Sequence, residues 1–304
     1  MKKLVVGMIV VLSISAGNLW AQSPKPYKPG GVKAKDVVYS FAPHPYLTPK
    51  ELYAAYEPIM RYLERKIPGA KFQVETSTDY ADYEAKIASR RFHFGLPNPY
   101  QTVLSLGHGY HVIAKMAPDE DFRGLMVVRK DRKPRQPGDL AGQPLCFPSP
   151  TAVAATMLPL LYLHDHGLNL KESPIKYVGS PASAIMHVYT GDAAACGVSI
   201  RHWRIWRQDN ADKASELDTL WLTGSLPHNS VIARDDVPAN LARQVGAALI
   251  AMDKDPQLDQ TQFRAGQSHF EPANDATYKV MAQFLKRYDE AIGLPAQMRK
   301  QPSR

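Results

Sequence analysis

Segments with the pattern of buried strands alternate with segments of helical periodicity through the first third of the chain. This alternation constrains the fold more than any other feature. Short apolar runs rich in β-branched and aromatic residues are typical of strands, and apolar residues three and four apart are typical of helices. The strand patterns lie at residues 37–41, 72–75 and 92–96, and the helical patterns at 52–65, 79–90 and 100–106. Because strands and helices alternate, we predict a mostly parallel sheet covered on both faces.

A second set of alternating segments follows. Its strands are expected at 145–147, 175–178 and 193–198, and its helices at 151–164, 182–189 and 200–209. Strands at 220–222 and 230–233 are expected to return the chain to the first set, and residues 238–293 are expected to be helical. The chain is therefore predicted to be an α/β protein of two lobes, each a mostly parallel sheet flanked by helices, joined by two crossing strands. Lobe 1 would contain residues 36–124 plus 226–304, and lobe 2 residues 125–225.

Residues 1–21 have the composition of a secretory signal peptide. Two lysines precede an apolar run and then small residues, and cleavage is expected after Ala21. The apolar run is too short to span a bilayer, and an uncleaved anchor is the alternative. Residues 22–35 are rich in proline, glycine and lysine and are expected to form a flexible leader. We therefore expect the mature protein to be exported.

The net charge of the chain limits the classes of binding partner that we expect. The formal net charge of +8 comes from 37 Lys and Arg residues against 29 Asp and Glu residues. This mild excess fits anionic ligands, a membrane surface or a dispersed basic surface. The sequence has no basic stripe interleaved with aromatic residues, so nucleic acid is not expected as a partner.

The chain has two cysteines, Cys146 and Cys196, which fall on two strands expected in lobe 2. An exported protein can form a disulfide. A disulfide across adjacent parallel strands is geometrically awkward, so two buried thiols are expected and a disulfide is the alternative.

The stretch Phe147–Pro159 has the pattern of a strand that runs into the first turn of a helix. Backbone N–H groups at a helix start lack intrahelical partners and carry a partial positive charge, so they can hold anions. Where other anion sites add hydroxyl groups, this segment has the run Ala152-Val153-Ala154. In open α/β sheets ligands bind beyond the C-terminal ends of the strands. Two such lobes facing each other form a cleft that can close by a hinge.

Short motifs in a fixed order carry a family resemblance over about residues 36–250. They are Tyr56–Leu63 in the first helix, Asp79-Tyr80 after the second strand, Asn98–Tyr100, Arg123–Arg129, Asp139–Gly142, Phe147–Pro159, Gly179-Ser180 and Gly191-Asp192. With these motifs the chain resembles the phosphate, phosphite and phosphonate substrate-binding proteins of ABC transporters, as a divergent member. The resemblance implies the two-lobed periplasmic binding protein type II fold and a location in the periplasm.

The resemblance also implies a function. It indicates a solute-binding protein that is not an enzyme, needs no cofactor, acts as a monomer and captures a small anionic ligand for a membrane permease. A ligand-sensing or interaction protein of the same fold, acting on a membrane sensor kinase, is the alternative. An enzyme on this fold is disfavoured because the sequence shows no acid–base constellation, nucleophile elbow or phosphate-binding loop.

Departures from the family pattern shape the expected site. The serine–threonine–serine loop of the family aligns with Ala152-Val153-Ala154, its histidine after glycine–serine with Pro181, and its tyrosine at the entry to the second lobe with Phe122. The acidic residue that holds a ligand amine in aminophosphonate binders aligns with Arg201. Losing these donors disfavours tight binding of a phosphonate dianion. Arg201 would instead pair with a carboxylate or another planar oxyanion.

The ligand-binding residues expected from these matches and from positions at strand ends are Tyr80, Asn98, Tyr100, Phe122, Thr151, Ala152, Val153, Ala154, Ser180 and Arg201. Some have a structural alternative. Tyr80 would pack on the sheet, Thr151 would cap a helix, and Arg201 would lie on a solvated helix face.

Histidines give weaker signals. His228, at the return crossing, could reach the cleft or form a turn. The histidines at 108–111 and 164–166 lack the spacing and the acidic partners of a metal site, so no metal is expected.

Overall fold

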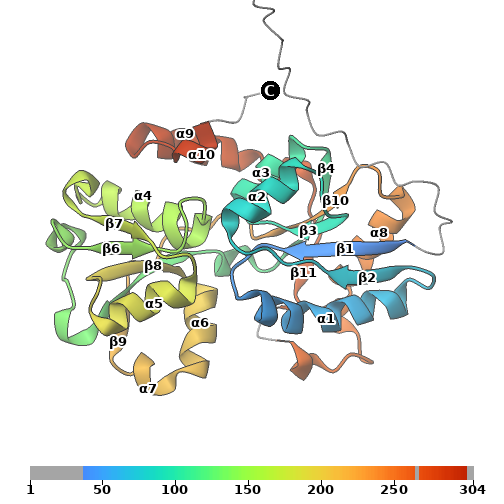
Figure 1. Ribbon diagram of the computed structural model, residues 1–304, viewed down its shortest axis with the longest axis horizontal. Helices are drawn as coiled ribbons and strands as arrows, with labels where there is room; N and C mark the ends of the chain where they lie inside the picture. Colours follow the sequence, from blue (N-terminus) through green and yellow to red (C-terminus); the bar gives the residue numbers. More distant parts are fainter. Residues whose placement is uncertain (1–36, 264–266, 300–304) are drawn as a thin grey trace, which may run out of the picture.

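The computed structural model describes residues 37–263 and 267–299, and Figure 1 shows them as two α/β lobes side by side. The expected signal peptide and leader lie outside the described residues. Within the described part of the chain, no helix is both long and apolar enough to cross a membrane.

The first lobe is built on a six-stranded sheet of strand order β11-β4-β10-β3-β1-β2. β1 is parallel to β2 and β3, whereas β10 and β11 run antiparallel to their neighbours. The strands are β1 Val38–Pro43, β2 Lys71–Val74, β3 Phe94–Leu96, β4 Tyr110–Met116, β10 Ser230–Arg234 and β11 Phe270–Glu271. Helices pack on both faces: α1 Pro49–Lys66 and α8 Ala239–Ile250 on one, α2 Tyr80–Ala88 and α3 Pro99–Leu106 on the other.

The second lobe is built on a five-stranded sheet of order β7-β6-β8-β5-β9. β6 is parallel to β7 and β8, and β5 is antiparallel to β8 and β9. The strands are β5 Gly124–Arg129, β6 Leu145–Phe147, β7 Ile175–Tyr177, β8 Ala195–Ser199 and β9 Leu217–Leu220. The helices are α4 Leu158–Asp165 on one face, α5 Pro181–Thr190 and α6 Ile200–Asp209 on the other, and the short α7 Ala211–Ala214. The predicted fold class, two sheets flanked by helices, is confirmed.

The chain passes between the sheets twice. It leaves β4 at Met116 and enters β5 at Gly124, and it leaves β9 at Leu220 and enters β10 at Ser230. The two connections lie side by side where Thr223 N donates to the Gly124 carbonyl at 2.9 Å. These connections form the junction beside which the site is found.

Two segments differ from the sequence prediction. The strand expected at 220–222 is β9, which ends at Leu220 and pairs with β5 in the second sheet. It ends there because Trp221 has a φ of 56°, a left-handed conformation that a strand cannot continue. Within the stretch 238–293, expected to be helical, Phe270–Glu271 form β11 at the edge of the first sheet.

The expectation of two free thiols is wrong: Cys146 and Cys196 form a disulfide. The two residues are register partners on the adjacent parallel strands β6 and β8. Their Cα atoms are 4.4 Å apart, at the short end of the range that a disulfide spans. The bond ties the strand that leads into the Phe147–Pro159 stretch to the centre of the second sheet.

A C-terminal helix, α9 Val280–Ala291, lies across both lobes (Figure 1). It packs against α3 of the first lobe and α4 of the second. Its buried Met281 and Tyr288 belong to one apolar cluster that includes side chains of both lobes. Arg287 on α9 also pairs with Asp165 at the end of α4, with 2.5 Å between Nη2 and Oδ2.

Candidate functional site

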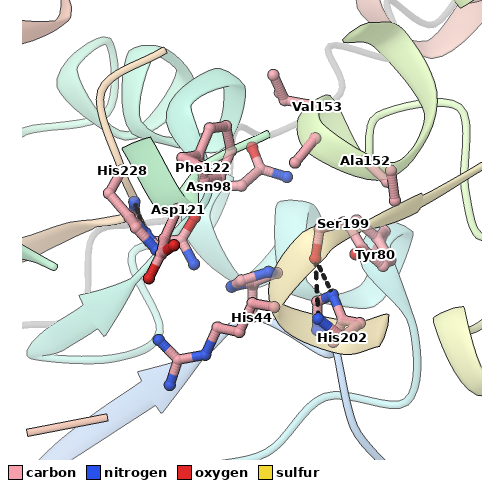
Figure 2. A pocket seen from close by; sticks show the side chains of 14 residues that line it. His44, Tyr80, Asn98, Asp121, Phe122, Ala152, Val153, Ser199, His202 and His228 are labelled. Atoms are coloured by element: carbon pink, nitrogen blue, oxygen red, sulfur yellow. Dashed lines mark hydrogen bonds between the residues drawn. The ribbon is translucent and has the colours of Figure 1, made fainter. Parts of the chain in front are cut away.

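A small cavity lies between the two lobes, beside their connections (Figure 2). Its volume is about 40 Å³, enough for a few atoms of a small ligand. Both lobes and both connections contribute to its lining. The lining residues are His44, Tyr80, Asn98, Asp121, Phe122, Ala152, Val153, Ala154, Ala155, Ser199, Arg201, His202, His228 and Asn229.

Three helices begin at the cavity because capping side chains start them there. Asp79, Asn98 and Ser199 cap α2, α3 and α6, and each accepts a hydrogen bond from a backbone N–H of the first helical turn. The predicted cap at Asp79 is confirmed, with 2.8 Å between its Oδ1 and Asp82 N. Helix starts carry partial positive charge, so their convergence favours an anion.

One side of the cavity is formed by Ala152–Ala155, which we call the apolar wall. The helix expected from residue 151 begins instead as a π-helical turn, Val153–Met157, before α4 starts at Leu158. Single π-turns are rare and occur frequently at functional sites. The turn sits directly on the second sheet: a Cβ at Gly124 would overlap the Ala154 carbonyl, and a Cβ at Gly197 the Ala155 carbonyl.

Three histidines line the opposite side among the described residues, and we call His44, His202 and His228 the imidazole cluster. His44 follows β1, His202 lies in the first turn of α6, and His228 lies on the return connection. Their rings pack edgewise or tilted on Tyr80, Tyr46 and Phe122 respectively, with centroids 5.1–5.9 Å apart. Sequence reasoning missed His44 and His202 and left His228 open. The available signal was their position at strand ends, where ligands bind in α/β sheets.

Each imidazole has a hydrogen bond that fixes its ring. His44 Nδ1 lies 3.0 Å from the Leu96 carbonyl oxygen, and His228 Nδ1 accepts from Asn229 N at 2.7 Å. His202 Nδ1 lies 2.5 Å from Ser199 Oγ, as the dashed line in Figure 2 marks. The rings are therefore held in place before a ligand arrives.

The imidazole cluster is uncharged at neutral pH. Burial lowers the pKa of His44 to about 4 and that of His202 to about 3, and it lowers the pKa of His228 well below its usual value. The positive charge of Arg201 lowers all three further. Burial also raises the pKa of Tyr80, which therefore stays a neutral hydroxyl.

Arg201 faces the cavity. It lies in the first turn of α6, directly after β8, and its Nη1 lies 3.8 Å from Met116 Sδ across the junction of the lobes. The solvated helix face, its alternative placement, is taken by Arg204, which pairs with Asp121 at 2.7 Å, and by the exposed Arg207. The Arg201 guanidinium lines the cavity and acts electrostatically on all three rings of the imidazole cluster.

Three residues expected in the site do not line the cavity. Thr151 instead joins the lobes: its Oγ1 donates to Glu84 Oε1 at 2.6 Å, and its carbonyl accepts from Asn98 Nδ2 at 3.0 Å. Ser180 caps α5, accepting from Ser183 N at 3.1 Å. Tyr100 is buried in α3 among the core side chains.

The other expected residues, which are Tyr80, Asn98, Phe122, Ala152, Val153, Ala154 and Arg201, are brought together around the cavity. The cavity thus offers a guanidinium, imidazoles, an amide and helix-start N–H groups on one side and methyl groups on the other. Nowhere in residues 37–263 or 267–299 are three histidine, cysteine or acidic side chains grouped so that they could hold a metal ion.

The sequence matches a known protein family. The sequence model of the family described as "ABC transporter, phosphonate, periplasmic substrate-binding protein" matches residues 41–278. No curated protein matches the chain in sequence.

Solved structures share the fold at low identity. PhnD1 of Prochlorococcus marinus, in complex with methylphosphonate, is 15% identical, with a TM-score of 0.75 over 85% of this chain and 100% of that one. A binding component of an ABC phosphonate transporter from Pseudomonas aeruginosa is 13% identical, with a TM-score of 0.73 over 86% and 91%. The alkanesulfonate-binding protein SsuA of Xanthomonas axonopodis pv. citri, bound to MOPS, is 13% identical, with a TM-score of 0.53 over 85% and 80%.

Proposed function

Because this chain belongs to the phosphonate periplasmic substrate-binding protein family of ABC transporters, we propose that it captures a small anion between its two lobes and delivers it to a membrane permease. The observation that carries this proposal is the Arg201 guanidinium, which lines a cavity between the lobes where helix starts converge. The low dielectric of a protein interior strengthens the attraction between such a cation and an anion.

The chemistry of the lining favours a small anion with an apolar part. The Nε2–H of His228 and the Arg201 guanidinium supply donors in place of the hydroxyls that the apolar wall lacks. Val153 and Phe122 offer contact to a methyl or similar group. We propose that the protein acts as a monomer in the periplasm, with residues 1–21 removed and with the lobe boundaries expected from the sequence.

A thermal-shift screen of the mature protein tests the proposal. The panel is methylphosphonate, methanesulfonate, phosphate and acetate, with glycerol as an uncharged control. An anion present at 100 times its Kd should add about 2.7 kcal/mol to the free energy of unfolding. If none of the anions raises the melting temperature, the proposed ligand class is wrong.

Arg201→Ala tests the observation directly. Hydrogen bonds to charged groups contribute about 1.5–3 kcal/mol, so we expect the affinity for the best anion to fall by about one to two orders of magnitude. Arg207→Ala is the matched control, because Arg207 lies on the same helix but is exposed and outside the cavity. Equal affinity of Arg201→Ala and wild type would remove Arg201 from the site.

Signalling through a membrane sensor kinase remains the alternative use of the same cleft. Deleting the gene separates the two roles. Loss of anion uptake with an unchanged transcriptional response supports transport, and the reverse result supports signalling.

A further inference from the structure

The three rings of the imidazole cluster differ in which nitrogen remains for a ligand. A neutral imidazole carries a hydrogen on one nitrogen and a lone pair on the other, and only the protonated ring donates from both. The hydrogen bonds already made inside the protein therefore decide what each ring offers to the cavity.

His44 offers a lone pair when it is neutral. A carbonyl oxygen can only accept, so Nδ1 must donate its hydrogen to Leu96 O, 3.0 Å away. The nitrogen left for the cavity, Nε2, then has no hydrogen and would repel the oxygen of an anion. His44 can donate to an anion only as the imidazolium.

His228 is the opposite case. The Asn229 N–H donates to its Nδ1 at 2.7 Å, so the neutral ring carries its hydrogen on Nε2. It can donate to an anion without taking up a proton, and protonating Nδ1 would break the bond to Asn229. His202 fits either state, because the Ser199 hydroxyl beside its Nδ1 can donate or accept.

The charges around His44 come from several segments. Arg201 of α6 is the cation that acts on it, the titratable rings of His202 and His228 interact with it electrostatically, and the rings of Tyr46 and Tyr80 pack against it. The nearby acids on the first connection already have partners: Asp119 pairs with Lys115 at 2.6 Å and accepts from His228 N at 2.7 Å, and Asp121 pairs with Arg204. Asp119 and Asp121 are therefore already engaged by other groups. A bound anion would add a new negative charge next to His44.

We propose that anion capture is coupled to the uptake of one proton, which His44 holds in the complex. This inference rests on the proposed function, since it requires an anion in the cavity. In the empty protein the pKa of His44 is about 4, because of burial and Arg201. A bound anion raises that pKa, so binding takes up a proton between the two values. Affinity then increases as the pH falls through the pKa of the complex and levels off below about 4.

Methanesulfonate is the probe for this test, because its sulfonate stays a monoanion throughout pH 5–8 and any proton must bind to the protein. Isothermal titration calorimetry across this range should show Kd tightening by up to tenfold per pH unit at the acid end. Titrations at one pH in two buffers of different ionisation heat should give an uptake approaching one proton. If only methylphosphonate binds, the ¹⁵N signals of His44 with and without the ligand replace the proton count, because this ligand itself titrates near neutral pH.

Glutamine variants separate the rings. His44→Gln should remove most of the pH dependence, because the pKa of the remaining His202 is lower, whereas His228→Gln should weaken binding but keep the pH dependence. His166→Gln is the control, because His166 is exposed at the end of α4. If His44→Gln fails to fold, the ¹⁵N spectrum of wild-type histidines with and without methanesulfonate replaces it, and Nε2 of His44 should gain a hydrogen on binding.

Two results would overturn the inference while leaving the proposed function standing. One is an affinity that varies less than twofold between pH 5 and pH 8 with no net proton uptake. The other is a His44→Gln protein with the wild-type pH dependence. If phosphate, methylphosphonate, methanesulfonate and acetate all fail to bind at every pH, the proposed function itself fails, and this inference fails with it.

Discussion

The two sides of the cavity differ in the groups that they present to a ligand and in the contacts that hold them in place. The apolar wall contributes methyl groups and the backbone of a π-turn, whereas the opposite side contributes imidazoles and a guanidinium from both lobes. The apolar wall is positioned by local contacts. The disulfide at Cys146 directly precedes the Phe147–Pro159 stretch, and Gly124 and Gly197 allow the carbonyls of the wall to contact the sheet. The imidazole cluster is positioned by contacts between distant segments. Shape on one side and titratable charge on the other can therefore be altered separately.

The largest expected effect is on the anchoring of the apolar wall. The double variant Cys146→Ala with Cys196→Ala removes a cross-link that spans 50 residues, which should lower the free energy of unfolding by about 2–4 kcal/mol. Urea unfolding measures it. Treating wild type with a reductant should produce a similar loss, and an unchanged midpoint in both experiments would show that the cross-link does not anchor this wall.

Gly197→Ala should also act on the apolar wall. The added Cβ would overlap the Ala155 carbonyl and the Phe147 ring, so we expect a loss of about 1–3 kcal/mol and weaker anion binding as the π-turn moves. Gly138→Ala is the control, since nothing lies within 4 Å of its Cβ position. Unfolding and calorimetry report the two effects. Wild-type stability in Gly197→Ala would mean that the turn does not rest on the sheet.

Thr151→Val tests the contact between the lobes. It leaves the half-buried Glu84 carboxylate with Gln101 as its remaining donor in the described contacts, which should cost about 1–2 kcal/mol. Burial raises the pKa of Glu84, and losing the threonine donor raises it further. The cost should therefore be larger at pH 8, where the carboxyl is charged, than at pH 4.5. A cost independent of pH in paired unfolding curves would argue against this explanation.

The smallest effect is expected from giving the apolar wall a hydroxyl. Ala154→Ser should tighten methylphosphonate binding by a few-fold, because an added hydrogen bond typically contributes about 1 kcal/mol net. Methanesulfonate, whose charge is lower, should gain less. Calorimetry with both ligands decides it, and weaker binding of both would indicate that the wall needs an apolar surface.

The elements and their order could be predicted from sequence because they depend on local patterns. The alternation of strands and helices, the cap at Asp79 and the motif order all follow from neighbouring residues. Arg201 was also located, because a residue just after a strand lies at the cleft edge in this class of fold.

What could not be predicted depends on register and on distant segments. The Cys146–Cys196 disulfide follows from which residues of β6 and β8 are opposite each other, and residues 50 apart carry no local sign of that pairing. The imidazole cluster unites residues 44, 202 and 228, which meet only when both connections are formed. The resemblance places the hydroxyl donors of the family on the loop that aligns with Ala152–Ala154. It therefore gives no information about these rings.

The helix α9 has a consequence for how the cavity fills. Two lobes that are joined only by their connections can separate by rotating about them. Here, however, α9 packs on both lobes. Opening must either slide α9 over α4 and break the Arg287–Asp165 pair, or carry α9 with the second lobe and peel it from α3. Separating the lobes therefore has to break contacts of α9 that lie outside the cavity lining.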